Sequence, residues 1–252
     1  MNNKQLDKNE VLNRRMQKVA KLQHTLKAKF NSKEKKRCQA LSQYFEKGSV
    51  VFDVGGHFGY LTKEFAKLYG GGCSIHSFEP TSYNYDVLQR VCGKIKNAVL
   101  NNFALSDSKG TVDINIPVKK QGKIGPGLAH FGDETNRDYI TESIDTITMD
   151  EYMTENDIQN LDFIKCDVEG AELLVYKGGL NTLKKYKPVV YTEIREQFTQ
   201  RLGYSAKEIF NLFFDLGYKA YICNEAGIRS NEVKTYTDEA QDYLFIPDEK
   251  SY

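Results

Sequence analysis

Apolar residues recur at every third or fourth position near the N-terminus, a spacing that predicts an amphipathic helix over residues 5–30. A second helix is expected over residues 31–45, with Ser32 as its candidate N-cap. We expect these helices to lie on the following domain, to form a lid, or to make a contact between two copies of the chain. Contact with an anionic membrane surface or a nucleic-acid backbone is the alternative. The apolar stripe of the first helix comprises Leu6, Val11, Leu12, Met16, Val19, Leu22, Leu26 and Phe30.

The pattern changes at Ser49, where short apolar runs begin to alternate with amphipathic segments. Strands that alternate with helices indicate an α/β fold with a doubly wound, mostly parallel sheet and helices on both faces. Ligands bind such folds at the carboxyl ends of the strands. Strands are predicted at residues 49–55, 74–80, 97–107, 110–118, 142–153, 161–170, 187–194, 219–224 and 242–248. Helices are predicted at residues 60–72, 81–94, 171–186 and 205–218.

Charge divides the chain into a basic helical extension, residues 1–45, and a domain, residues 46–252. Residues 1–37 hold twelve Lys or Arg and three Asp or Glu, a net charge of +9. The remainder therefore carries −8, because the whole chain has a net charge of +1. With 252 residues, 40% of them hydrophobic, the chain is long enough to form a sizeable core.

What the sequence lacks disfavours several classes of protein. No apolar run reaches the roughly 18 residues of a membrane-spanning helix. The polar N-terminus does not read as a secretory signal, so we expect a cytoplasmic protein. Free thiols are expected, without a structural disulfide or a zinc site, because the cysteines are scattered and odd in number. They are Cys38, Cys73, Cys92, Cys166 and Cys223.

The stretch VVFDVGGHFGY, residues 50–60, reads as a strand that enters a helix through glycines. Glycine lets a ligand approach the backbone closely because it has no Cβ. The stretch matches neither the G-x-G-x-x-G of dinucleotide-binding folds nor the G-x-x-x-x-G-K-S/T phosphate loop. It reads D-x-G-x-x-x-G, formed by Asp53, Gly55 and Gly59. An acid there suits a cationic ligand, and S-adenosylmethionine carries an ammonium and a sulfonium but no phosphate.

The next predicted strand ends in SFEP, which places Glu79 24 residues after Gly55. In nucleoside-binding α/β folds, an acid about 20 residues beyond the glycines accepts hydrogen bonds from ribose hydroxyls. NAD enzymes use the same arrangement, and Glu79 could also belong to the first turn of a helix that Pro80 begins. Together with the glycine turn, the spacing favours the ribose role.

Five segments occur in an order and spacing that resemble a known family. They are VVFDVGGHFGYLT, SFEP, NNFALSDSKG, DFIKCDVEGAE and KPVVYTEI. Together they resemble the FkbM family of S-adenosylmethionine-dependent methyltransferases, over about residues 49–200 and more loosely beyond. The resemblance implies a Rossmann-like class I methyltransferase fold, with a seven-stranded sheet whose last strand is antiparallel. It also implies methyl transfer to a hydroxyl, commonly on a sugar or a polyketide-type natural product.

The resemblance further implies roles in cofactor binding. The glycine turn would pass under the methionine part of S-adenosylmethionine, with Asp53 near its ammonium, and Glu79 would hold the ribose. His57 stands where many class I enzymes have glycine, and we expect no catalytic role for it. The expected cofactor residues are Asp53, Gly55, Gly56, His57, Gly59, Tyr60, Glu79, Pro80, Asp167 and, around the adenine, Phe103, Ala104 and Leu105.

Three acids that follow predicted strands, Asp167, Glu169 and Glu193, are candidate catalytic residues. An alcohol is a weak nucleophile, so a base or a metal usually helps to remove its proton. We expect Asp167 on the acceptor or methionine side and Glu193 as a base or a ligand. Asp167 and Glu169 could instead cap the following helix. A Mg²⁺ ion held by these oxygens is the less favoured option.

The glycine-rich loop over residues 121–137 is a candidate specificity segment. His130 within it is a candidate base, because imidazole titrates near neutral pH, although loop histidines are more often simply solvated. Arg137, Tyr139 and Arg195 could hydrogen-bond a sugar.

The leading hypothesis is an O-methyltransferase that acts on a hydroxyl of a sugar, a glycan or a natural product. The alternative is a nucleic-acid methyltransferase that holds phosphates with the basic extension, although no D/N-P-P-Y/F motif appears. A non-enzymatic binding module and an NAD-dependent oxidoreductase are weaker hypotheses, because the cofactor residues are intact and the G-x-G-x-x-G pattern is broken. A small-molecule or glycan acceptor and a second copy of the chain are the expected partners.

Overall fold

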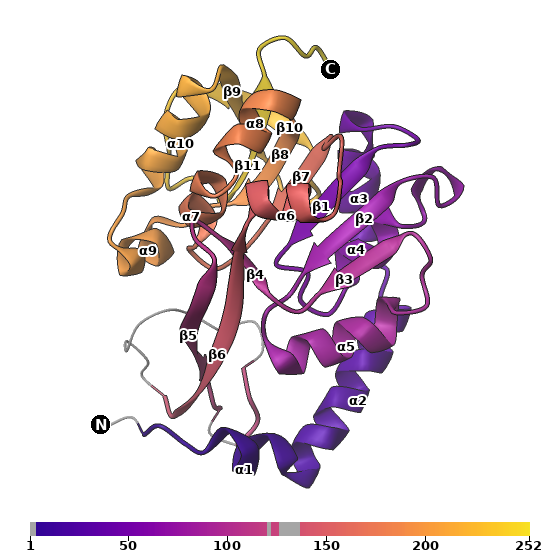
Figure 1. Cartoon of the computed structure of the whole chain (residues 1–252), viewed down its shortest axis with the longest axis vertical. Helices are drawn as coiled ribbons and strands as arrows, with labels where there is room; N and C mark the ends of the chain where they lie inside the picture. The colour runs from indigo at the N-terminus through magenta and orange to yellow at the C-terminus, as the bar shows by residue number, and fades with distance from the viewer. Residues whose placement is uncertain (1–3, 120–121, 126–136) are drawn as a thin grey trace.

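The main sheet has eight strands and occupies the upper part of the molecule in Figure 1. The computed structural model describes residues 4–119, 122–125 and 137–252. Across the sheet the strands are β10 (Arg229–Val233), β9 (Tyr218–Cys223), β11 (Asp242–Pro247), β8 (Val189–Glu193), β7 (Phe163–Cys166), β1 (Val50–Val54), β2 (Ser74–Phe78) and β3 (Ala98–Asn101). Strands β8, β7, β1, β2 and β3 are parallel, and β11 runs antiparallel between β8 and β9.

The doubly wound sheet and its antiparallel last strand have the expected class I arrangement, with one strand more than the seven expected. The additional strand is β10, which pairs antiparallel with β9 at the edge of the sheet. Its sequence, RSNEV, is polar and largely exposed. No apolar alternation therefore marks it in the sequence.

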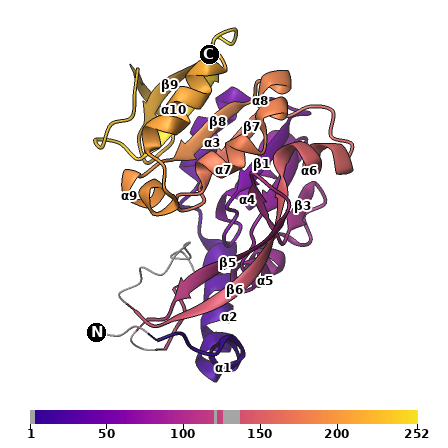
Figure 2. The same ribbon diagram turned by 60° about the vertical axis from the view of Figure 1, so that its left-hand side comes forward.

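A second sheet, of three strands in the order β4-β6-β5, projects from the main sheet (Figures 1 and 2). Its strands are β4 (Ala104–Ser106), β5 (Gly110–Pro117) and β6 (Tyr139–Thr148). The single strand predicted over residues 97–107 is wrong, because β3 ends at Asn101 and β4 belongs to the second sheet. Between them, Asn102 Nδ2 donates to the carbonyls of Glu79 and Pro80, at 3.0 Å each, and fixes the turn.

The strand predicted over residues 142–153 also ends early. Thr148 and Glu151 form a capping box, in which each side chain accepts a hydrogen bond from the other's backbone N–H. The chain therefore enters a helix, α6, at Met149.

Helices cover both faces of the main sheet because alternate strand residues point to opposite sides. Val51 packs with helices α3 and α4 on one face, whereas Phe52 packs with α6, α7, α8 and α10 on the other. The helices are α1 (Lys8–Asn13), α2 (Arg15–Phe30), α3 (Lys35–Leu41), α4 (Tyr60–Phe65), α5 (Ser82–Cys92), α6 (Met149–Glu155), α7 (Glu172–Lys177), α8 (Leu180–Tyr186), α9 (Glu196–Thr199) and α10 (Ala206–Asp215). Short 3-10 turns lie at η1 (Ser42–Tyr44), η2 (Leu68–Gly70) and η3 (Gln200–Leu202).

The N-terminal extension forms α1, α2 and α3, with a break in the helix expected over residues 5–30. The break is at Arg14, whose φ of −55° and ψ of 137° are not helical. Helix α2 lies against α5, as expected for a helix on the domain, but with the face opposite to its apolar stripe. Small and polar side chains fill that contact, whereas the stripe from Met16 to Phe30 is exposed.

All five cysteines are buried and are present as free thiols. They lie on α3, α5, β7, β9 and the segment just before β2. Within the described part of the chain, no helix is both long enough and apolar enough to cross a membrane.

Candidate active site

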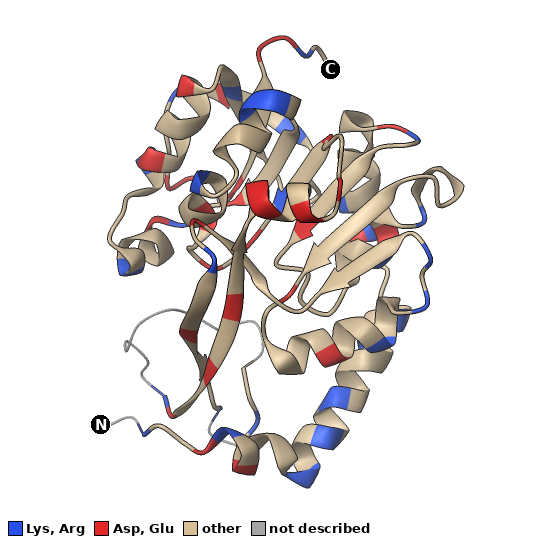
Figure 3. Ribbon diagram, in the orientation of Figure 1, with Lys and Arg blue, Asp and Glu red and all other residues tan. Residues whose placement is uncertain are grey.

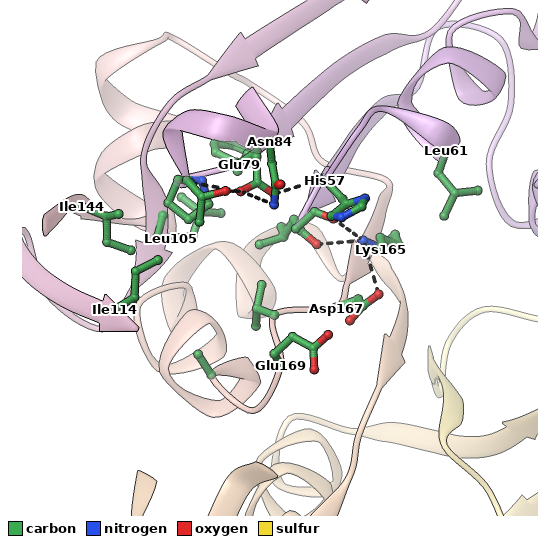
Figure 4. Close-up of a pocket in the computed structure, with 18 of the residues that line it drawn as sticks. His57, Leu61, Glu79, Asn84, Leu105, Ile114, Ile144, Lys165, Asp167 and Glu169 are labelled. Atoms are coloured by element: carbon green, nitrogen blue, oxygen red, sulfur yellow. Dashed lines mark hydrogen bonds and ion pairs between the residues drawn. The ribbon is translucent and has the colours of Figure 1, made fainter. Parts of the chain in front are cut away.

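A cavity of about 350 Å³ lies at the carboxyl ends of β1, β2 and β7, where doubly wound sheets bind their ligands (Figure 4). Its wall includes Gly55 after β1, Glu79 after β2, and Lys165 and Asp167 around the end of β7. The second sheet and α3 contribute further wall residues. The cavity is therefore assembled from segments that are far apart in the sequence.

The glycine turn brings the ends of β1 and β7 together. Gly55 has a φ of +78°, and a Cβ there would lie 1.9 Å from the carbonyl oxygen of Asp167. Only glycine permits this approach. Gly55 lines the cavity, and so do His57 and Tyr60 from the same turn.

Gly56 and Gly59 make room for packing behind the turn. A Cβ on Gly56 would lie 2.1 Å from Ser77 Oγ, and one on Gly59 would lie 2.7 Å from Cys92 Sγ. Neither glycine is among the residues of the cavity wall. The turn can therefore press closely against β2 and α5, and direct cofactor contact by these two glycines stays a prediction.

Asp53, the acid of the glycine motif, is buried beneath the turn and is 1% exposed. Thr62 Oγ1 donates to its Oδ2 at 2.6 Å, and Lys165 Nζ lies 3.3 Å from its Oδ1. The same ammonium donates to the carbonyls of Val54, at 3.1 Å, and Gly55, at 2.7 Å. Asp53 is therefore not on the cavity wall itself, but it pairs with Lys165, which is. The sequence patterns did not single out Lys165.

His57 is neutral at pH 7. Burial, with Lys165 nearby, lowers the pKa of its imidazole to about 4. Its ring packs on Phe58 with a centroid distance of 3.9 Å, and no described group hydrogen-bonds its Nε2. The His57 ring therefore adds no charge to the cavity wall.

Glu79 is buried on the cavity wall, and its carboxylate organises the surrounding loops. Its Oε2 accepts from the backbone N–H of His57 at 2.9 Å. Its Oε1 accepts from the N–H of Thr81 at 3.0 Å, the hydroxyl of Thr81 at 2.6 Å and Asn84 Nδ2 at 3.3 Å. Burial raises the pKa of Glu79, and these hydrogen bonds oppose the rise. Pro80 lines the cavity directly after it.

One end of the cavity is apolar. Ala104 and Leu105, which the resemblance places beside an adenine, line this end, and the adenine contact stays a prediction. Ile114 of β5 and Ile144 of β6 line it as well, although the sequence pattern indicated only that they alternate with polar residues in a strand. Phe103 is absent from the cavity wall and packs on Phe78, with ring centroids 6.0 Å apart.

Acidic side chains gather at the other end. Asp167 and Glu169 line the cavity. Burial, with Asp167 and Glu193 as neighbouring charges, raises the pKa of Glu169 to about 7. Burial also raises the pKa of Glu193, which forms an ion pair with Arg195. Glu169 is thus a carboxylate that can take up a proton near neutral pH.

Glu172 holds the loop that carries these acids through hydrogen bonds to the loop backbone. Its Oε1 accepts from the N–H groups of Val168 and Gly170, at 3.1 Å each. Gly170 has a φ of +107°, and a Cβ there would lie 2.7 Å from the backbone of Phe198. Burial raises the pKa of Glu172 to about 7. These contacts hold the left-handed turn at Glu169, whose φ is 54°.

Two residues of the N-terminal extension complete the wall. Glu34 and Arg37 line the cavity and form an ion pair at 3.1 Å. Arg37 also donates from Nε to the carbonyl of Glu225 at 3.0 Å. The sequence offered no signal for them beyond their place in a basic helix.

The remaining expectations concern the loop and a metal. His130 lies outside the described residues, together with most of the loop over residues 121–137. Tyr139 is part of β6 and is not on the cavity wall. Within the part of the chain that the structure describes, no group of three or more His, Cys, Asp or Glu side chains is arranged to hold a metal ion. The Mg²⁺ suggestion therefore gains no support.

Fold and site together define a class of protein. A doubly wound sheet with an antiparallel last strand, a glycine turn after β1 and an acid after β2 are the features of the class I methyltransferase fold. The model of the methyltransferase FkbM domain matches residues 53–220. The chain belongs to the FkbM methyltransferase family.

Two relatives illustrate the similarity. The 2-O-methyltransferase NoeI of Sinorhizobium fredii is 25% identical over 158 residues, which cover 59% of this chain and 64% of NoeI. The crystal structure of methyltransferase FkbM from Methylobacillus flagellatus is 16% identical, with a TM-score of 0.51. It matches 81% of this chain, which spans 45% of that longer one. The chain thus spans less than two thirds of either relative's length, and the structural match concerns the fold alone.

Proposed function

We propose that the chain transfers a methyl group from S-adenosylmethionine to a hydroxyl of a sugar-containing or natural-product acceptor. The observation that carries the proposal is Glu169, a cavity-wall carboxyl whose pKa burial raises to about 7. A base of that strength suits the removal of a hydroxyl proton near neutral pH. The name of NoeI, a 2-O-methyltransferase, supports oxygen as the atom methylated.

The cofactor half of the cavity suits an adenosine. The apolar end formed by Leu105, Ile114 and Ile144 would hold the adenine. Oε2 of Glu79 accepts one hydrogen bond, from His57, so it has capacity for a ribose hydroxyl. Gly55 and Asp167 would border the methionine part.

Asp53 would act on the methionine part indirectly. Its carboxylate is 1% exposed and is engaged by Thr62 and Lys165. Lys165 in turn holds the carbonyls of the glycine turn and lies 4.0 Å from Asp167 Oδ2. The carboxylate of Asp167, whose side chain is 40% exposed, is the one left to face a ligand ammonium.

The acceptor half supplies the base. When bound, S-adenosylmethionine supplies a methyl group whose carbon–sulfur bond breaks as the acceptor oxygen attacks the carbon. Glu169 takes the proton from that oxygen and becomes a neutral acid. Glu193 and Arg195 keep a charged pair close to Glu169 and would orient further hydroxyls of the acceptor.

Calorimetry and a transfer assay test the proposal. S-adenosylhomocysteine should bind and NAD should not. A methyl-labelled donor should then label a hydroxyl of an acceptor in a panel of glycans and hydroxylated natural products. Glu169→Gln should slow labelling by roughly 10²–10⁴ without loss of S-adenosylhomocysteine binding, whereas Glu155→Gln, at an exposed ion pair with Lys109, should change neither. Binding of NAD alone, or full activity of Glu169→Gln, would contradict the proposal.

A further inference from the structure

Helix α2 presents an apolar stripe to solvent. The exposed fractions are 39% for Met16, 49% for Val19, 55% for Leu22, 47% for Leu26 and 82% for Phe30. At 100° per residue these positions form one stripe roughly 120° wide along the helix. A continuous exposed apolar surface marks an interaction site. We refer to these five residues as the α2 stripe.

The opposite face of α2 is fixed to the domain. Its buried residues are Gln17, Ala20, Thr25 and Ala28. Gln17 Nε2 donates to the carbonyl of Gly122 at 2.7 Å. The ring of His24 stacks on Phe58, with centroids 4.9 Å apart. These contacts hold the stripe outward.

The C-terminal end of α2 is anchored as well. Lys63 Nζ, on a side chain that is 7% exposed, donates to the carbonyl of Lys29 at 3.1 Å and that of Asn31 at 2.6 Å. It also donates to the carbonyl of Ala28. A buried ammonium thus satisfies carbonyls that the helix end leaves open. The stripe is presented by a helix fixed at this end as well as along its inner face.

Basic residues border the stripe on both sides. By helical projection Lys18 and Lys29 follow one border, Lys27 follows the other, and Arg15 lies near the start of the stripe. All four are exposed, and α2 contains no Asp or Glu. Figure 3 shows blue bands of Lys and Arg along α2, at the lower right of the molecule. An apolar stripe with Lys and Arg at its borders is the composition of a helix that lies in a membrane interface.

We propose that α2 docks on the surface of an anionic lipid bilayer, with the α2 stripe in the boundary between headgroups and acyl chains. Lys18, Lys27 and Lys29 then face the lipid headgroups, and their attraction to negative charge adds to the burial of the apolar side chains. A bilayer thus provides an apolar environment for the α2 stripe and negative charge for its basic borders.

A second copy of the chain or a nucleic acid would complement only one part of this surface, either the apolar stripe or the basic borders. Pairing of α2 with α2 of a second copy would bring rows of Lys and Arg together without an acid to pair with them, and like charges disfavour such a pair. A nucleic acid would meet the basic borders and leave five large apolar side chains without a partner.

Docking through α2 would also bring the cavity close to the bilayer. Phe30 ends α2, and Glu34 and Arg37, which line the cavity, follow within the next seven positions. The proposal concerns where the enzyme lies and is independent of which acceptor it methylates.

Vesicle flotation tests the proposal with the full chain. The vesicles are phosphatidylcholine alone or phosphatidylcholine with phosphatidylglycerol, each at low and at high salt. Leu22→Ser/Leu26→Ser should lower the fraction bound to the anionic vesicles at least ten-fold, because both side chains are exposed in solution and buried in the interface. Val99→Ser/Ile228→Ser removes apolar side chains of 44% and 53% exposure elsewhere and should leave binding unchanged.

A second variant and its control test the contribution of the basic borders. Lys18→Gln/Lys27→Gln/Lys29→Gln should weaken binding to the anionic vesicles several-fold, and high salt should do the same to the unaltered protein. The matched control, Lys94→Gln/Lys96→Gln, changes exposed lysines that lie outside α2 and should not weaken it.

Three results would overturn the proposal. The first is that the unaltered protein does not float with anionic vesicles. The second is equal binding by Leu22→Ser/Leu26→Ser and its control. The third is a dimer in sedimentation experiments that this same variant converts to a monomer, which would identify a second copy as the occupant. Circular dichroism shows whether each variant keeps its helices, so a loss of folding is distinguishable from a loss of docking.

Discussion

Lys165 and Asp53 form a buried ion pair between neighbouring strands. They are register partners in the parallel pairing of β7 with β1, and Lys165 Nζ lies 3.3 Å from Asp53 Oδ1. Burial disfavours the charged lysine, but Asp53 and Asp167 outweigh it and raise the pKa of Lys165. The ammonium therefore stays charged and holds the carbonyls of Val54 and Gly55 in place under the cavity.

Lys165→Met should destabilise the fold by about 3–5 kcal/mol, because it leaves the carboxylate of Asp53 buried without its partner. Urea unfolding measures the change. The double variant Asp53→Asn/Lys165→Met should be less destabilised than Lys165→Met alone, since neither charge remains. Lys109→Met, which removes an exposed ion pair with Glu155, should leave the stability nearly unchanged, because solvent screens exposed charges. Equal losses in the single and double variants would refute the pairing argument.

The rate of methyl transfer should fall below about pH 7. Burial, Asp167 and Glu193 raise the pKa of Glu169 to about 7, and only its deprotonated form can accept the acceptor proton. Measurement of kcat/KM against pH should therefore show an acid limb with an apparent pKa near 7. In Glu169→Gln the rate should fall by roughly 10²–10⁴ and the limb should disappear. An unchanged limb in Glu169→Gln would assign the titration to another group.

Glu172 should make the fold less stable as the pH rises. Burial raises its pKa in the folded chain from 4.5 to about 7, so the stabilising form is the neutral acid. That contribution is complete below the ordinary pKa and is lost as the pH rises through the folded one. The free energy of unfolding of the unaltered protein, relative to Glu172→Gln, should fall by about 3 kcal/mol between pH 4 and pH 8. Parallel pH profiles for the two proteins would contradict this cause.

Glu79→Gln should weaken the binding of S-adenosylhomocysteine by about 1.5–3 kcal/mol, as the loss of charged hydrogen bonds does. Calorimetry measures the affinity. Glu46→Gln, at an exposed position outside the cavity, is the control and should bind as the unaltered protein does. An unchanged affinity in Glu79→Gln would remove the ribose assignment.

Periodicity predicted the architecture because the main strands are short apolar runs that end at glycines or acids. Val51 and Phe52 are neighbours in β1 and belong to the two cores on opposite faces of the sheet, so both positions are apolar. Where the pattern was ambiguous, tertiary contacts decided. Residues 97–107 read as one strand, yet the hydrogen bonds of Asn102 redirect the chain between two sheets. The polar β10 pairs with β9 at the edge of the sheet, a contact that its own sequence does not indicate.

Site residues were predictable where a local sequence motif determines the backbone. They were less predictable where an interaction joins residues that are distant in the sequence. Gly55 and Glu79, which the spacing singled out as cofactor residues, both line the cavity, and their contact with a cofactor stays a prediction. Lys165 reads as a polar interruption in an apolar run, and its partner lies more than a hundred residues away. In helix α2 the sequence pattern was misleading. An apolar stripe usually marks the buried face of a helix, whereas here it marks the exposed face.

The burial of every thiol has a practical consequence. All five cysteines of the folded chain are buried, so none offers an accessible thiol to a maleimide dye or a thiol-reactive spin label. A single engineered cysteine at an exposed position, such as Leu22→Cys, would therefore be the one site modified under native conditions. Fluorescence quenching or spin-label accessibility at that position could then follow α2 in solution and beside a bilayer, with the native sulfurs silent until the protein unfolds.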